Sequence, residues 1–70
     1  MFKKGDRFRH YMGKEVELLA VDVRHTETDE DLVIYFDINE PELIWAKPHE
    51  LFFRLVEVTG GSVARFTVID

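Results

Sequence analysis

Apolar and polar residues alternate with a period of two along most of the chain, which is the pattern of half-buried β-strands. Helical periodicity is almost absent. The pattern predicts strands at residues 7–11, 15–25, 32–37, 43–47, 52–59 and 62–69. Polar, acidic loops at residues 26–31 and 38–42 separate the middle strands, and the first of these is typical of a solvated hairpin tip. The chain is therefore expected to be almost entirely β.

The second segment contains a change of phase that predicts an irregularity within one long strand. Val16 and Leu18 share one parity, whereas the apolar residues from Leu19 onward take the other. An extra residue in one strand of a pair produces a β-bulge, which bends the strand and increases its twist. We therefore expect a bulge or a sharp bend near Leu19 and Ala20, where one long strand would pass from one side of a small barrel to another.

Two local signals mark the second half of the chain. Pro48 precedes three residues that suit a single helical turn, because proline at the first helical position loses no hydrogen bond. A short 3₁₀ turn fits residues 48–51 equally well. The pair Gly60-Gly61 separates two alternating segments and predicts a hairpin with a type I′ or II′ turn, since those turns need positive φ.

Five to six short strands, with one short helical turn before the last hairpin, are typical of a small antiparallel SH3-like barrel. The whole chain, residues 1–70, would form this single domain. An OB-like barrel is the alternative, although it would need a longer helix between strands. The apolar residues expected to form the core are Phe8, Val16, Leu18, Val21, Val23, Val33, Tyr35, Leu43, Trp45, Leu51, Phe53, Leu55, Val63, Phe66 and Val68.

The composition indicates a soluble protein of a reducing compartment. Of the 70 residues 46% are hydrophobic, which argues against disorder. There is no cysteine, whereas small secreted domains usually carry disulfides, so we expect a cytoplasmic location. No apolar run is long enough to span a membrane or to act as a signal peptide. The net charge of −5 repels phosphate backbones and makes nucleic acid a less favoured partner.

Several stretches, in this order along the chain, carry a resemblance to a known family. They are Arg9-His10-Tyr11-x-Gly13-Lys14-Glu15, Arg24-His25-Thr26-Glu27-Thr28, Leu32-Val33-Ile34-Tyr35, Trp45-x-Lys47-Pro48, Phe52 and Arg65-Phe66. Over residues 5–66 the chain resembles the small bacterial DUF1653 family, whose function is not established. Family members usually have arginine where this chain has Lys47, and this chain carries one extra residue between Leu18 and Arg24. The resemblance implies a fold and a set of recurring residues but no activity.

The candidate binding residues come from two Arg-His doublets at strand ends and from the Trp-x-Lys-Pro segment. They are Arg9, His10, Tyr11, Arg24, His25, Trp45 and Lys47. Arginine offers a rigid fork of donors for phosphate or carboxylate, and an aromatic ring offers a flat wall. The structural alternative is that each arginine pairs with a carboxylate on a neighbouring strand and that the doublets fix hairpin ends. Trp45 shares the parity of Leu43, which favours its burial in the core.

Other chemistry has little support in the sequence. The three histidines have no metal-ligand spacing and the acidic loop at residues 26–31 lacks calcium-loop spacing, so we expect no metal and no cofactor. The only serine, Ser62, is explained by the tight turn, and no catalytic residue is assigned. The leading hypothesis is a non-enzymatic binding module for a protein, peptide or small anionic ligand. The alternatives are a nucleic-acid-binding accessory domain and a small enzyme with His10 or His25 as general base at a dimer cleft.

One segment raises the possibility of self-association. Residues 52–56 are apolar on both parities, so that one face enters the core while Phe52 and Val56 lie on the other. A symmetric partner would bury these two side chains in a homodimer. The other interpretation is that a curled strand is covered on both sides within one chain.

Overall fold

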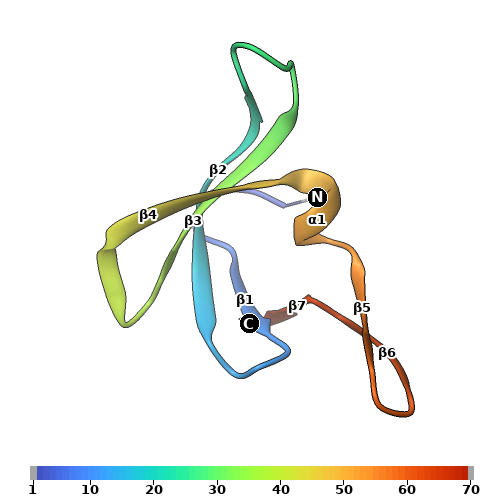
Figure 1. Cartoon of the computed structure of the whole chain (residues 1–70). Coiled ribbons are helices and arrows are strands. Elements are labelled where there is room, and N and C mark those ends of the chain that lie inside the picture. Colours follow the sequence, from blue (N-terminus) through green and yellow to red (C-terminus); the bar gives the residue numbers. More distant parts are fainter. Residues whose placement is uncertain (1, 70) are drawn as a thin grey trace.

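The computed structural model describes residues 2–69 and is nearly all β, as the sequence predicts. Its elements are β1 (Arg7–His10), β2 (Glu15–Arg24), β3 (Asp31–Asp37), β4 (Glu40–Pro48), α1 (His49–Phe52), β5 (Leu55–Val58), β6 (Gly61–Ala64) and β7 (Phe66–Ile69). Five strands form an antiparallel sheet in the order β4-β3-β2-β1-β7, and β5 and β6 form a separate two-stranded sheet (Figure 1). Within residues 2–69 no ladder joins β4 to β7, so closure of the sheet into a barrel stays a prediction.

The strong twist of the sheet originates in β2. The register between β2 and β3 shifts between Leu18 and Ala20 and again between Ala20 and Val23. Asp22 lies within the second shift and has a φ of 57°, in the left-handed region. This confirms the bulge that the phase change predicts, and the pairing of β3 with β4 continues the twisted sheet beyond it.

The last predicted strand divides at Arg65, where the chain passes from the two-stranded sheet into the main one. The hairpin of β5 and β6 is confirmed, but its turn residues are Thr59 and Gly60, because Val58 pairs with Gly61. Gly60 has a φ of 92°, whereas Thr59 is not among the residues of positive φ. A type I′ or II′ turn needs positive φ at its first central residue, so the predicted turn type is wrong. The turn also lies one residue earlier than predicted, at Thr59-Gly60 instead of Gly60-Gly61.

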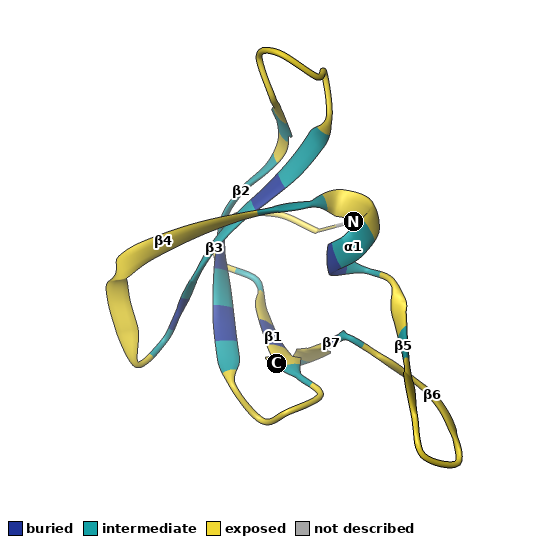
Figure 2. Ribbon diagram, viewed as in Figure 1, coloured by how far each residue is buried: buried dark blue, intermediate teal, exposed yellow. Residues whose placement is uncertain are grey.

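The core is a small group of side chains between α1 and the concave side of the main sheet. Its buried members are Phe8, Val16, Leu18, Val33, Phe52 and Phe66, with Val21, Tyr35 and Phe53 packed against them. The rings of Phe52 and Phe66 stack with centroids 4.1 Å apart, and Phe8 meets Phe52 edge-on at 5.3 Å. Figure 2 shows this burial as dark segments within β1, β2 and β3 and at the end of α1. The buried Asp37 at the end of β3 is polar and lies outside this group.

Several expectations about burial are wrong, and the topology gives the reason. The residues expected in the core but found exposed are Leu43, Trp45, Leu55, Val63 and Val68. They belong to the two edge strands β4 and β7 or to the separate hairpin, which have a neighbour on one side only or stand off the sheet. Conversely, Phe52 has no exposed surface, because α1 turns it onto the sheet instead of extending β5. Phe52 is therefore covered within its own chain.

Candidate functional site

A cavity of about 690 Å³ lies between the β1–β2 turn and strands β3, β4 and β7. Its lining combines charged and polar side chains with apolar ones: His10, Met12, Lys14, Val16, Tyr35, Asp37, Glu40, Trp45, Lys47 and Phe66. The sheet register explains why they meet. Tyr35 pairs with Trp45 across β3 and β4, and His10 pairs with Phe66 across β1 and β7. Side chains directly opposite one another in an antiparallel pair share a face, so aromatic groups from four strands gather here.

The cavity wall is aromatic and includes the one tryptophan of the chain. Trp45 is 53% exposed, contrary to its expected burial, since β4 is an edge strand. Tyr35 is half-buried, and its ring lies 5.9 Å from that of Phe66. Burial raises the pKa of the Tyr35 hydroxyl, and the positive charge of Arg65 opposes this shift. The exposed side chain of Trp45 therefore lines the cavity, and the rings of Tyr35 and Phe66 form its apolar interior.

The surroundings of His10 lower the pKa of its imidazole. Partial burial lowers its pKa below 6.5, and the positive charges of Arg65, Lys47 and Lys14 lower it further. The main-chain N–H of Met12 donates a hydrogen bond to His10 Nδ1 at 3.1 Å. A neutral imidazole whose Nδ1 accepts must carry its proton on Nε2. His10 is thus a hydrogen-bond donor through Nε2.

Three cations surround the imidazole, and two of them have no anionic partner among residues 2–69. Lys14 lies 3.9 Å from the carboxylate of Asp37. Lys47 and Arg65 take part in no ion pair within the described part of the chain. The Nε of Arg65 is buried and has no hydrogen-bond partner there. This side of the cavity is therefore positive in a protein whose net charge is −5.

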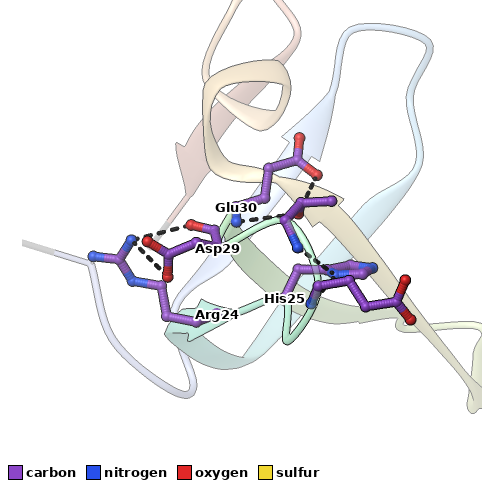
Figure 3. Close-up of polar contacts among 6 residues, drawn as sticks. Arg24, His25, Asp29 and Glu30 are labelled. Atoms are coloured by element: carbon purple, nitrogen blue, oxygen red, sulfur yellow. Dashed lines mark hydrogen bonds and ion pairs between the residues drawn. The ribbon is translucent and has the colours of Figure 1, made fainter.

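The second doublet lies at the other end of β2, away from the cavity. In the β2–β3 loop, Arg24 Nη1 donates to the carbonyl of Asp29 at 3.2 Å and lies 3.8 Å from its carboxylate (Figure 3). His25 Nδ1 accepts from the main-chain N–H groups of Glu27 at 3.1 Å and Thr28 at 3.4 Å (Figure 3). These contacts all stay within the loop, so Arg24 and His25 serve its conformation.

The first doublet also makes local contacts at the β1–β2 turn, although its arginine pairs with a side chain across β1 and β2. Arg9 Nη2 donates to Glu15 Oε2 at 3.0 Å, while His10 accepts from an N–H two residues ahead, as His25 does. The ring of Tyr11 is exposed and lies 4.6 Å from that of His10. The structure therefore supports hairpin fixation for both doublets and does not bring them to one corner.

Of the seven candidate residues, His10, Trp45 and Lys47 line the cavity and Tyr11 adjoins it through the ring of His10. Sequence reasoning missed Lys14, which lines the cavity, and Arg65, which does not line it but acts electrostatically on His10 and Tyr35. Both stand within the family-like stretches. Tyr35 was placed in the core without its role as cavity wall. These residues can be found only from the strand pairing, because it places β3 beside β4 and β7 beside β1.

Comparison with known families agrees with the motif stretches. The family model described as "Protein of unknown function (DUF1653)" matches residues 6–68, nearly the whole chain, which confirms the resemblance. No curated protein and no solved structure matches the chain. Among the described residues, no helix is long and apolar enough to cross a membrane.

Proposed function

We propose that this chain, which belongs to the DUF1653 family, is a non-enzymatic binding module for a small ligand with a flat apolar part and an anionic group. The observation that carries the proposal is the exposed face of Trp45 beside Lys47 on one wall of the cavity. Small-molecule sites are concave, largely apolar and equipped with a few polar groups that fix orientation. The cavity has these properties, and its polar groups differ in charge from one side to the other.

The apolar part of the ligand would lie against aromatic side chains. Trp45 is half-exposed at the wall, and Tyr35 stands opposite it on β3. An indole offers a large flat surface at a low entropic cost, since only two torsions become fixed. A planar ring is therefore the shape that this wall favours.

The anionic group would lie on the side of Lys47 and His10, within the positive field of Arg65, which does not itself line the cavity. Lys47 has no ion pair among residues 2–69, so an incoming anion need not displace a carboxylate from it. His10 adds a donor through Nε2. The carboxylates of Asp37 and Glu40 on the cavity lining would face donor groups of the ligand. The ligand is thus polar at two ends and apolar between them.

The geometry of His10 favours binding over general-base catalysis. A general base needs a free lone pair on the nitrogen that faces the substrate. In neutral His10 the Nδ1 lone pair accepts the Met12 N–H, and the other nitrogen carries the proton. The side chain is therefore suited to donate a hydrogen bond and not to abstract a proton, which supports a non-enzymatic role.

The test uses the intrinsic fluorescence of Trp45, the single tryptophan of the chain. Phenyl phosphate, benzoate and adenosine monophosphate would be titrated, with phenol, benzamide and adenosine as uncharged counterparts. We expect a saturable emission change with at least one anion and a weaker response to its counterpart. Lys47→Gln should weaken binding about tenfold, as the loss of a charged contact of about 1.5 kcal/mol does.

The matched control is Lys4→Gln, which removes an exposed lysine outside the cavity. It changes the net charge by the same amount and should leave the affinity within about twofold. Equal weakening by the two variants would show a general charge effect instead of a site. Absence of a saturable change with every anion, together with unmoved ¹⁵N–¹H signals of the Trp45 indole, would refute the proposal.

A further inference from the structure

The pairing of β3 with β4 gives the cavity wall a fixed order of charges. Alternate residues of a strand share one face, and directly paired residues lie side by side on it. A register shift next to Asp37 brings Glu40 opposite to it. The successive pairs on this face are Val33↔Lys47, Tyr35↔Trp45 and Asp37↔Glu40, and all of these residues except Val33 line the cavity. The wall is therefore cationic at one end, aromatic in the middle and acidic at the other end.

The two charged ends of this wall are too far apart to neutralise each other. Val33 and Asp37 mark the two ends on β3, and at about 3.3 Å per residue they lie about 13 Å apart. Lys47 at one end and Glu40 at the other take part in no ion pair among residues 2–69. The long, flexible side chain of Lys47 can reach back along the wall, so a ligand shorter than about 13 Å can also span both ends.

Asp37 keeps unused acceptor capacity at the acidic end. It is the one buried charged residue among residues 2–69, with 9% of its surface exposed. Its Oδ1 accepts the main-chain N–H of Asn39 at 2.8 Å, and its Oδ2 lies 3.9 Å from Nζ of Lys14, which is too long for a hydrogen bond. The Lys14 side chain is 73% exposed, so this ion pair is weak. A carboxylate can accept about four hydrogen bonds, and a buried one is costly without them.

We propose that the ligand of this cavity carries a cationic amine at the end opposite to its anionic group, and that Asp37 and Glu40 bind this amine. The inference rests on the binding module proposed above and assigns its ligand to the amphoteric molecules, in which an anion, a planar ring and an amine follow one another. An ammonium has three donors, which the two carboxylates can accept. Asp37 is thus the residue that distinguishes such a ligand from a simple aromatic anion, which would leave the carboxylate without this donor.

The test titrates para-aminomethylbenzoate at neutral pH, with para-hydroxymethylbenzoate as its counterpart without the cation, and follows the emission of Trp45. We expect the amine to bind about tenfold more tightly, because hydrogen bonds between charged groups are strong. Asp37→Asn should abolish this preference, since the amide keeps an oxygen for the Asn39 N–H but loses the charge. The matched control is Glu57→Gln, which removes an exposed carboxylate outside the cavity and should retain the preference.

Equal affinities of the two para compounds for the unaltered chain would overturn the inference. So would a preference for the amine that survives in Asp37→Asn. The ortho isomer of aminomethylbenzoate carries the same charges side by side, and it should bind no better than the hydroxymethyl compound because it cannot reach both ends of the wall. An ortho isomer that binds as tightly as the para compound contradicts the proposed order of charges.

Benzoate and benzylamine separate this inference from the proposed function. If benzoate does not bind but benzylamine binds in a manner that depends on Asp37, the anionic side of the proposed function fails and the amine site stands. If no amine binds, the inference fails. Far-UV circular dichroism shows whether Asp37→Asn is folded. If it is not, the side-chain carboxyl ¹³C signal of Asp37 in the unaltered chain decides, and it should move with para-aminomethylbenzoate and stay in place with the hydroxymethyl compound.

Discussion

Phe52 offers the sharpest test of the packing, because the sequence pattern leaves open whether a second copy or its own chain covers it, and the structure buries it within its own chain. Its ring is wholly buried and stacks on Phe66 at 4.1 Å, with edge contacts to Phe8 at 5.3 Å and Tyr35 at 5.5 Å. Phe52→Leu keeps an apolar side chain but removes these three ring contacts and a fourth, to the neighbouring Phe53 at 4.8 Å. Aromatic pairs contribute about 0.5–1.5 kcal/mol each beyond the area they bury, and neighbouring pairs are not additive.

We therefore expect Phe52→Leu to lower the free energy of unfolding by about 2 kcal/mol, taking the ring contacts together below their sum. For a chain of 70 residues the whole free energy of unfolding is about 3.5–10 kcal/mol, so the variant should still fold. The corresponding fall in Tm is about 8–16 °C. Urea and thermal unfolding followed by far-UV circular dichroism would measure both quantities.

The matched control is Phe36→Leu on β3. Phe36 is half-buried and has no aromatic ring contact among residues 2–69, so the same substitution should cost less than about 1 kcal/mol. If Phe52→Leu costs no more than Phe36→Leu, the ring cluster around α1 does not stabilise the core. The assignment of Phe52 to a monomer core would then fail.

Two further predictions concern the cavity and the bulge. The pKa of His10 is lowered in the folded chain, so the unfolded chain binds a proton more tightly and stability should fall as pH drops from about 6.5 through the folded-state pKa. His10→Gln should lose less stability between about pH 7 and pH 5, and equal losses in thermal unfolding would contradict this. Asp22→Val should cost about 1–2 kcal/mol in urea unfolding despite the strand pattern, because a β-branched residue resists a φ of 57°. Asp22→Gly should stay within about 0.5 kcal/mol, and a harmless Asp22→Val would refute the left-handed backbone there.

Period-two patterning predicted where the strands lie in most of the chain, because alternate burial follows directly from strand geometry. It did not predict that Phe52 belongs to α1 or that the last strand divides at Arg65. It also located the bulge, since the phase change between Leu18 and Leu19 reflects a real shift of register. It was not sufficient for burial on the edge strands. Trp45 and Val68 have the right parity but too few neighbours, and only the strand order shows this. The environment of Phe52 was left open between two interpretations, because residues 52–56 carry apolar side chains on both parities and so have no phase of their own.

The candidate site was predictable in part for a related reason. The structure brings His10, Trp45 and Lys47 to one cavity, as the grouping of these residues predicts, and their role in binding stays a prediction. Arg24 and His25 were grouped with them because the two doublets resemble each other in sequence. Their likeness reflects a shared task at two hairpin turns, in which an imidazole accepts a main-chain N–H. Arg65 acts on His10 and Tyr35 from a distant part of the chain, and no local pattern shows such a contact.

The pairing of β1 with β7 has a consequence for how the chain folds as it is synthesised. Strands β2, β3 and β4 are joined by short hairpins and can pair as soon as they are made. β1 is made first, but Arg7 finds its second neighbour at Ile69, and Phe66 completes the ring cluster only when β7 arrives. Closing so long a loop is entropically costly and comes late. The edge of β1 that pairs with β7 therefore stays open during synthesis until β7 has been made and has paired with it.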